Sequence, residues 1–336
     1  MIDTEKFTIT LNNGVAFTCK KNVSLLDAAA AAGVAFPYSC RTGRCSSCKC
    51  KVLSGDTDCL TAELGLTEQE VSSGWVLACV RTALSDLMLV ANTVEDFDIP
   101  APQTLPCRIH DIKNLAPDVL SVKLRLPPSA DFKFLPGQYV DVIGPGGKRR
   151  SYSLANSYAT DKILELHIRS VNDGLFSAYW FETAKVNDLL RLHGPSGTFF
   201  LRGVKGKELV FLATGTGIAP VTSILGGLYE LPPEDWPETV SVYWGGRSSA
   251  DLYFNLDFQF KLISFIPVLS RPESSWVGEV GYVQDVLLSK RSDLSNMMVY
   301  ACGSNAMIKS AEAKLSAAGL REGCFMSDAF VCSARP

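Results

Sequence analysis

The chain begins with two short segments in which apolar and polar residues alternate. The apolar positions are Phe7, Ile9 and Leu11 in the first segment and Val15, Phe17 and Cys19 in the second. Asn13-Gly14 lies between the segments, and this dipeptide is the strongest short signal for a β-hairpin because both residues tolerate the positive φ of a tight turn. The pattern predicts an antiparallel hairpin at the start of the chain.

An alanine-rich segment over residues 25–32 has the features of a short helix. Ser24 and Asp27 are spaced as in a capping box, and Gly33 can adopt the left-handed conformation that ends a helix. The predicted helix leads directly into a segment rich in cysteine.

Hydrophobic patterning divides the remainder of the chain into two parts. From residue 107 to about residue 201, short alternating strands are separated by Pro, Gly and Asp turns, which predicts an antiparallel β-barrel. The strands expected there are 120–126, 138–142 and 163–168. From residue 208 onward, apolar strands alternate with helical stretches, which predicts a parallel, doubly wound α/β sheet. The expected strands are 209–213, 240–244, 267–269 and 298–301, and the expected helices are 221–231 and 306–318.

Periodicity is lost over residues 95–105, where Pro100 and Pro102 lie close together shortly before Pro106. Such a composition is typical of a stiff, extended linker between domains. We therefore expect a first domain over 1–94, a linker over 95–105, and further domains over 106–203 and 204–336. A length of 336 residues agrees with two or three domains.

The composition is that of a folded protein. Apolar residues make up 47% of the chain and charged residues 20%, and the longest small-apolar run, 28–36, is far shorter than the roughly 20 residues that a membrane span requires. We expect a cytoplasmic protein, because the start lacks the charged and apolar regions of a signal peptide. The net charge of −3, without a basic stripe, argues against a nucleic-acid partner.

Eleven cysteines in a chain without an export signal favour metal or redox chemistry over disulfides. Four of them, Cys40, Cys45, Cys48 and Cys79, have the spacing of plant-type [2Fe-2S] ligation. A structural zinc site is the alternative, since four thiolates can also bind one Zn²⁺. Cys50 could compete with Cys48 as a ligand. For Cys19, Cys59, Cys107, Cys324 and Cys332 we expect small buried or incidental thiols.

A second motif, Arg150-Ser151-Tyr152-Ser153, begins a predicted strand. An FAD site needs a guanidinium for the pyrophosphate, an aromatic ring against the isoalloxazine and a hydroxyl near N5, and Arg150, Tyr152 and Ser153 offer these groups. Arg149 is expected to face solvent, because strand alternation places Arg150 and Tyr152 on one face. Further along, Gly174 permits close backbone approach and Ser177 offers a hydroxyl to a phosphate. An exposed basic and aromatic pair on a surface strand is the alternative.

A third motif follows the predicted strand 209–213. It reads Thr214-Gly215-Thr216-Gly217-Ile218-Ala219-Pro220 and precedes a helix. Its glycines let backbone N–H groups approach a pyrophosphate, and the helix N-terminus contributes a favourable dipole.

Taken in order, these motifs resemble those of the ferredoxin-NADP reductase superfamily with an N-terminal plant-type ferredoxin domain, over essentially the whole chain. The resemblance implies a multidomain α+β and α/β fold. Its parts would be a β-grasp ferredoxin domain over 1–94, an FAD-binding antiparallel β-barrel over 106–203 and a nicotinamide-binding parallel-sheet domain over 204–336. The implied cofactors are a [2Fe-2S] cluster, FAD and NADH, with NADPH as the alternative, because Arg247 could contact a 2′-phosphate.

The resemblance also assigns roles to residues. Ser153 and Cys302 would orient the hydride path, Asp328 would assist with protons and Phe330 would cover the flavin. Residues implied to bind FAD or the nicotinamide nucleotide are Arg150, Tyr152, Ser153, Leu154, His167, Ile168, Gly174, Ser177, Gly215, Thr216, Gly217, Pro220, Arg247, Tyr253, Cys302 and Phe330. Six residues, 331–336, follow Phe330 and depart from the plant-type enzymes, which leaves the position of Phe330 open. Ser304 is expected to cap the helix after Cys302.

The resemblance implies a monomer in which NAD(P)H reduces FAD, and FAD passes single electrons through the cluster to a partner enzyme. An N-terminal ferredoxin domain occurs in reductase components of aromatic-ring and related oxygenases. It also occurs in the CDP-6-deoxy-glucoseen reductases, which serve a sugar-nucleotide dehydrase of 3,6-dideoxyhexose synthesis. Segments 194–200, 300–304 and 325–331 are most similar to the second group, which we favour. An Fe-S redox sensor or binding protein without turnover is the alternative of another class.

Overall fold

The computed structural model describes residues 5–95, 97–158, 160–172, 174–253 and 263–330. Contacts divide the chain into two compact units. One comprises the residues up to 98 together with the chain end from 328, and the other comprises residues 99–327.

The first unit is built on a five-stranded sheet with the strand order β2-β1-β7-β3-β5. Its strands are β1 (Lys6–Leu11), β2 (Ala16–Lys20), β3 (Lys49–Ser54), β5 (Trp75–Leu77) and β7 (Leu87–Val90). The predicted hairpin is confirmed, since β1 and β2 pair in antiparallel fashion with Ile9 opposite Phe17. A small second sheet joins β4 (Thr57–Cys59) to β6 (Arg81–Ala83).

Helix α1 (Leu25–Ala31) starts and ends where its local signals predict. The Ser24 hydroxyl accepts a hydrogen bond from the Asp27 N–H at 3.0 Å, and Gly33 takes a φ of +76° just beyond the helix end. Buried Leu25 and Ala29 of this helix belong to the same apolar core as Cys48 and Cys50. The cysteine-rich segment is therefore anchored on the core of this unit. A second helix, α2 (Glu68–Ser72), has a complete capping box from Thr67 and Glu70.

The second unit contains a six-stranded sheet of order β11-β10-β13-β8-β9-β12, whose described strand pairs are antiparallel. Its strands are β8 (Gln103–Ala116), β9 (Val119–Arg125), β10 (Tyr139–Ile143), β11 (Arg149–Ser153), β12 (Ile163–Arg169) and β13 (Leu189–Ser196). Strand β8 begins inside the segment expected to be linker. Gln103 and Leu105 pair with Gly194 and Leu192 of β13, a long-range contact that local composition did not indicate.

A second six-stranded sheet in this unit has the order β17-β16-β15-β14-β18-β19. Its strands are β14 (Glu208–Thr214), β15 (Thr239–Gly246), β16 (Ile263–Leu269), β17 (Glu279–Val280), β18 (Met297–Ser304) and β19 (Phe325–Phe330). Strand β14 pairs in parallel with both β15 and β18. The chain therefore leaves β14 in one direction and later returns to its other side, which creates a switch point at the carboxyl end of β14.

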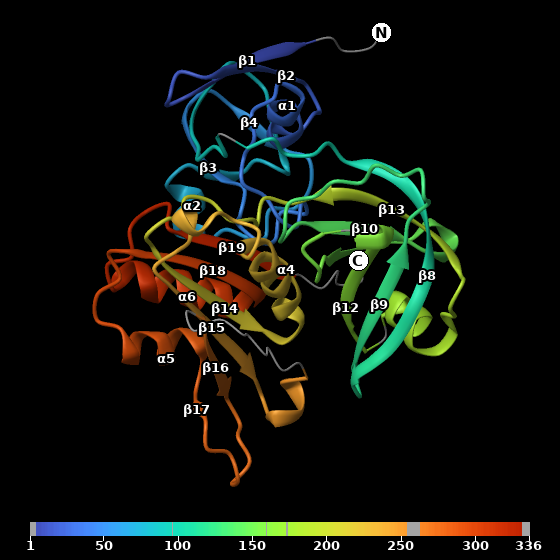
Figure 1. The fold of residues 1–336 in the computed structure, drawn as a ribbon. Coiled ribbons are helices and arrows are strands. Elements are labelled where there is room, and N and C mark those ends of the chain that lie inside the picture. Colours follow the sequence, from blue (N-terminus) through green and yellow to red (C-terminus); the bar gives the residue numbers. More distant parts are fainter. Residues whose placement is uncertain (1–4, 96, 159, 173, 254–262, 331–336) are drawn as a thin grey trace. The chain divides into compact units, whose positions relative to one another are not determined.

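Three helices flank this parallel sheet. Figure 1 shows α4 (Ile218–Leu228) on one side of the strands and α5 (Val283–Lys290) with α6 (Asn305–Ala317) on the other. Helix α4 starts three residues before the segment expected from the sequence, because Pro220 is accommodated in its first turn, where no intrahelical N–H bond is required. A short helix, α3 (Leu175–Ala178), lies between β12 and β13.

Candidate functional site

The structure brings the four predicted cluster cysteines together in pairs. Cys40, Cys45 and Cys48 lie on the loop before β3, and Cys79 lies on the turn between β5 and β6. Hydrogen bonding with Cys45 lowers the pKa of the Cys40 thiol to about 5. In the same way, hydrogen bonding with Cys48 lowers the pKa of Cys79. Each pair thus contains one sulfur that favours the thiolate, the form that binds iron.

The loop backbone directs N–H groups at these sulfurs. The N–H of Cys40 donates to the Cys45 sulfur and the N–H of Thr42 donates to the Cys40 sulfur, each at 3.4 Å. Arg41 and Ser46 adopt left-handed φ values of 55° and 64°, a conformation that non-glycine residues rarely take. The loop is therefore folded around its sulfurs at a local backbone cost, as a metal-cluster loop requires.

The other thiols belong to neither pair. Cys50 is 1% exposed and packs in the core, and burial raises the pKa of its thiol to about 12. Cys19 and Cys107 are buried, whereas Cys59 is exposed, and Cys332 lies outside the described residues. Among the residues that the structure describes, no three His, Cys, Asp or Glu side chains converge on a position for a single metal ion. The cysteine set is arranged as two pairs.

The Arg150 motif forms β11, at the edge of the antiparallel sheet. Arg150 is exposed, whereas Ser153 and Leu154 are buried. The Tyr152 ring packs beside Phe176 and edge-on to Trp180, and its hydroxyl accepts a hydrogen bond from the Trp180 indole at 3.0 Å. The tyrosine is therefore held in one orientation by aromatic contacts that the sequence motif did not reveal.

Two further predicted residues lie on the neighbouring strand β12. His167 and Ile168 are both buried, and His167 Nδ1 lies 3.3 Å from the Tyr253 hydroxyl. Near α3, the Ser177 hydroxyl accepts a hydrogen bond from the Val171 N–H at 2.9 Å, which leaves its own proton available to a ligand. A side chain on Gly174 would press against this hydroxyl, at 3.0 Å. The turn is compact because residue 174 is glycine.

The third motif forms a tight turn, Gly215–Gly217, at the carboxyl end of β14, and Thr216 is its central residue. A Cβ at Gly217 would lie 2.3 Å from the carbonyl oxygen of Cys302, which is itself fully buried at the end of β18. Pro220 lies in the first turn of α4. The predicted pyrophosphate loop and the predicted hydride-path cysteine are thus packed directly together at the switch point.

Ser304 caps helix α6 as predicted, because its hydroxyl accepts the N–H of Met307 at 3.3 Å. Asp328 is buried on β19 and Phe330 is partly buried. The six-residue extension 331–336 lies outside the described residues.

A charged bridge that the sequence did not indicate lies beside Arg247. Asp251 accepts the backbone N–H of Arg247 at 2.8 Å, and its carboxylate lies 3.5 Å from Arg247 Nε and 3.2 Å from Arg169 Nη2. Arg169 in turn lies 3.3 Å from Asp118. The backbone hydrogen bonds and these two guanidinium groups lower the pKa of Asp251 although burial opposes them. The spacing of Ser248 and Asp251, which form a capping box, was the available signal.

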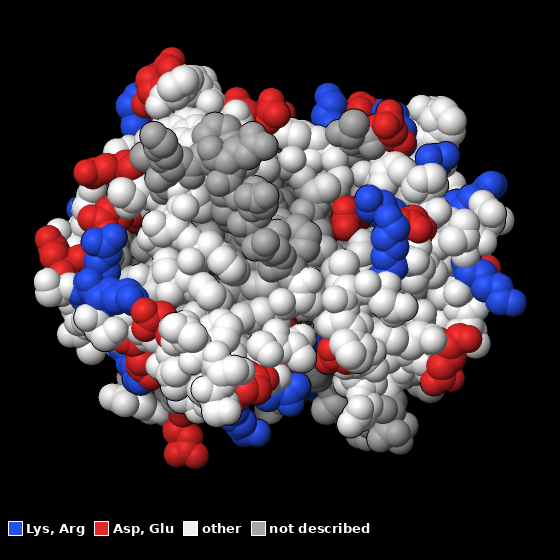
Figure 2. Space-filling view, turned by 60° about the horizontal axis from the view of Figure 1, so that its bottom comes forward, with Lys and Arg blue, Asp and Glu red and all other residues white. Residues whose placement is uncertain are grey.

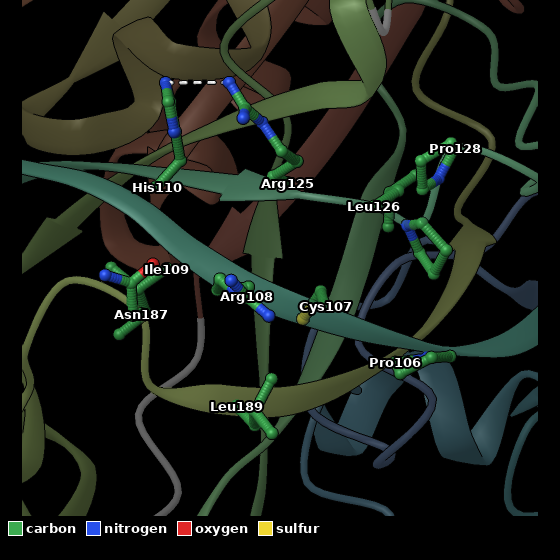
Figure 3. A pocket seen from close by; sticks show the side chains of 11 residues that line it. Pro106, Cys107, Arg108, Ile109, His110, Arg125, Leu126, Pro128, Asn187 and Leu189 are labelled. Carbon is green, nitrogen blue, oxygen red and sulfur yellow. Dashed lines mark hydrogen bonds between the residues drawn. The ribbon is translucent and has the colours of Figure 1, made fainter.

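A hollow of about 440 Å³ lies elsewhere on the antiparallel sheet. Figure 3 shows Arg108, His110 and Arg125 along it, with His110 and Arg125 hydrogen-bonded at 3.3 Å. It contains none of the residues expected to bind a cofactor. Figure 2 shows basic and acidic side chains interspersed over one face of the molecule.

Three family models match the chain in the predicted order. A 2Fe-2S iron-sulfur cluster binding domain matches residues 9–84, an oxidoreductase FAD-binding domain matches 106–201, and an oxidoreductase NAD-binding domain matches 211–313. A CDP-6-deoxy-L-threo-D-glycero-4-hexulose-3-dehydrase reductase from Yersinia pestis is 38% identical over 325 residues, which are 96% of this chain and 97% of that protein. The chain belongs to the ferredoxin-NADP reductase family. Within this family it is an iron–sulfur flavoprotein reductase.

Other members of the family serve oxygenases. The reductase component 1 of terephthalate 1,2-dioxygenase from Comamonas is 30% identical over 330 residues, covering 96% of each chain. The solved structure of a cytochrome P450 reductase from Amycolatopsis is 29% identical with a TM-score of 0.76, covering 98% of this chain and all of that chain.

As an iron–sulfur flavoprotein reductase, the chain is an NAD(P)H-dependent oxidoreductase with a 2Fe-2S domain, an FAD-binding domain and an NAD-binding domain. The paired thiols with N–H groups directed at sulfur fit a cluster that contains two iron atoms. The glycine turn at the switch point likewise fits the close approach of a dinucleotide phosphate. In the part of the chain that the structure describes, no helix is long and apolar enough to cross a bilayer.

Proposed function

We propose that this reductase takes electrons from NADH and delivers them, through FAD and the [2Fe-2S] cluster, to a sugar-nucleotide 3-dehydrase of dideoxyhexose synthesis. The observation that carries the choice of partner is the 38% identity, over nearly the full length of both chains, to a reductase named for such a dehydrase. Oxygenase reductase components match over a similar length at 30% identity. The alternative is therefore a reductase component of an aromatic-ring or other multicomponent oxygenase.

We assign the cluster ligands as Cys40 and Cys45 on one iron and Cys48 and Cys79 on the other. The two hydrogen-bonded sulfur pairs support this assignment. We leave Cys50 out of the ligand set, because it is buried in the apolar core and belongs to neither pair. Cys45 and Cys48 are each only 4% exposed, so water would have little access to the cluster beside these two residues.

Bound FAD converts a two-electron hydride donor into a source of single electrons. In this chain, the exposed guanidinium of Arg150 would bind the flavin pyrophosphate, and Tyr152, held by the Trp180 indole, would orient the flavin. Gly217 lets the nucleotide phosphate reach the backbone, and the helix that follows contributes its positive end. Ser153 and Cys302, both buried, would orient the hydride path. The family resemblance implies that Asp328 would assist with protons and that Phe330 would cover the flavin.

The charges around Arg247 support NADH over NADPH. A 2′-phosphate needs an uncommitted cation, whereas the Arg247 guanidinium lies beside the Asp251 carboxylate. The same carboxylate would repel the phosphate. Arg247 is nevertheless 67% exposed in its side chain, so that its charge is partly screened.

We assign residues 1–94 as a β-grasp ferredoxin domain, 106–203 as an FAD-binding barrel and 204–336 as the nicotinamide domain. The strand orders of the three main sheets support these assignments. We expect a cytoplasmic monomer.

Reconstitution tests the proposed partner. Purified reductase and NADH are supplied to a CDP-6-deoxyhexulose dehydrase and, separately, to a ring-hydroxylating oxygenase, and product is measured in each case. Product with the dehydrase is expected. Product with the oxygenase alone would select the alternative. Absence of NADH-dependent ferricyanide and cytochrome c reduction would select the redox-sensor class.

A further inference from the structure

A segment without cysteine bonds both to the loop that carries Cys40, Cys45 and Cys48 and to the turn that carries Cys79. This segment, residues 62–65, lies between β4 and α2 and has no regular secondary structure. On one side, the N–H groups of Leu64 and Gly65 both donate to the Gly43 carbonyl at 2.8 Å. The Ser46 hydroxyl donates to the Gly65 carbonyl at 2.6 Å. The segment is therefore bonded to the middle of the loop that carries Cys40, Cys45 and Cys48.

The same segment also forms hydrogen bonds with the turn that carries Cys79. One carboxylate oxygen of Glu63 accepts the Leu77 N–H at 2.6 Å and the Arg81 Nε at 3.3 Å. The second oxygen accepts Arg81 Nη2 at 2.8 Å. Leu77 and Arg81 stand two residues before and two residues after Cys79. A single carboxylate thus bridges the start and the end of the Cys79 turn.

This ion pair is withdrawn from water. The Glu63 side chain is 5% exposed and the Arg81 side chain 18%. Buried ion pairs give little net stability compared with apolar residues of similar size, because both charges must be desolvated. The geometry explains why a buried ion pair is present here. A carboxylate has two acceptor oxygens and can bridge a backbone N–H and a guanidinium at once.

The pair also lies close to the Cys79 turn. Glu63 accepts the N–H of Leu77 at 2.6 Å, and Arg81 stands two residues after Cys79. Charges at this depth are weakly screened by solvent, so their influence reaches neighbouring groups more strongly than that of surface charges.

We propose that Glu63 and Arg81 form a positioning pair, which fixes the Cys79 turn against the cluster loop and sets the reduction potential of the cluster through two opposed buried charges. The inference rests on the proposed ligand set. Reduction adds one negative charge to the cluster. Glu63 therefore disfavours the reduced state and Arg81 favours it.

Redox titration of the full-length holoprotein, followed by the EPR signal of the reduced cluster, tests the charge effect. Glu63→Gln is expected to raise the potential, Arg81→Gln to lower it, and the double variant to return most of the way to the wild-type value. The control pair is Lys21 and Glu5, which form an exposed ion pair at 2.9 Å in the same unit. Lys21→Gln and Glu5→Gln remove the same charges and should leave the potential unchanged. Shifts of one sign in both buried variants, or no shift beyond the controls, would overturn the inference.

Iron and sulfide content per chain tests the positioning effect. Glu63→Ala is expected to lose at least half of its cluster while FAD content is unchanged. Arg81→Lys keeps the charge but loses the two-pronged contact, so it should keep the wild-type potential with reduced cluster retention. Full retention in both variants would refute the positioning role. A wild-type protein without a [2Fe-2S] signal would instead contradict the ligand set itself, and with it the proposed function.

Discussion

The carbonyl oxygen of Cys302 occupies the space that a side chain at Gly217 would need, because a Cβ at Gly217 would lie 2.3 Å from that oxygen. Gly217 lies in the turn that follows β14 and Cys302 lies near the end of β18, and these two strands pair in parallel. The Gly215–Gly217 turn and the buried cysteine therefore form one packed unit. A change in either one should disturb the other.

We predict that Gly217→Ala impairs use of NADH. Overpacking against backbone costs about 1–3 kcal/mol, and a loss of this size in transition-state binding lowers kcat/KM roughly five- to more than a hundredfold. Stopped-flow bleaching of FAD by NADH measures the effect. Gly319→Ala serves as the control, because Gly319 has a φ of +95° but no atom within 4 Å of its Cβ position. The control should lose some stability and keep its NADH kinetics; equal kinetic losses in both variants would contradict the proposed close contact.

We predict that Cys79→Ser loses the cluster whereas Cys50→Ser keeps it. The Cys79 sulfur is paired with Cys48, but the Cys50 thiol is buried in the core, where burial raises its pKa to about 12. Visible absorption and iron content distinguish the two variants. Cys79→Ser should still reduce ferricyanide with NADH through FAD and should fail to reduce the partner enzyme. Cluster loss in the Cys50 variant alone would reverse the assignment.

We predict that Asp251→Asn shifts cosubstrate preference towards NADPH. The change removes a negative charge next to Arg247 and frees its guanidinium for a 2′-phosphate. The ratio of kcat/KM for NADPH to that for NADH should rise roughly threefold to tenfold, since a charge interaction of the largely exposed Arg247 guanidinium is worth about 1 kcal/mol. Asp285→Asn, which removes a carboxylate from an exposed pair with Lys314, is the control. An unchanged ratio would show that Asp251 does not influence the ribose site.

We predict an acid-dependent contribution of Glu165 to stability. Contact with His167 and a hydrogen bond from Ser121 hold the pKa of this carboxyl at about 2, below its ordinary value of 4.5. A depressed folded-state pKa stabilises the protein above the ordinary value, and this contribution is lost as pH falls from about 4.5 towards 2. Urea unfolding should show Glu165→Gln to be less stable than wild type at pH 7, with the difference shrinking below pH 4.5. A difference that is constant with pH would exclude this linkage.

Elements with local signals could be predicted from the sequence. The hairpin follows from Asn13-Gly14, and helix α1 follows from its Ser24 cap and the glycine that ends it. The beginning of β8 could not be predicted, because Gln103 pairs with Gly194, ninety-one residues later. Strand pairing at such separation leaves no periodic trace in a segment containing several prolines.

The candidate site shows the same division. The cysteines, the glycine turn and the Arg150 motif are recognisable because each needs a particular residue type at a fixed spacing. The Glu63–Arg81 pair and the Arg169–Asp251 bridge cannot be recognised in the sequence, because their residues are far apart in the chain and meet only after folding. A charged residue in a loop is usually solvated. Only the folded structure shows that Glu63 and Asp251 are buried.

The most direct test of the central claim is anaerobic mixing of the holoprotein with NADH, followed by absorbance and by EPR of rapidly frozen samples. We predict that flavin absorbance falls first and that the signal of a reduced [2Fe-2S] cluster then appears. In Cys79→Ser, we predict only the fall in flavin absorbance. A cluster that remains oxidised after the flavin has been reduced would contradict the proposed electron path.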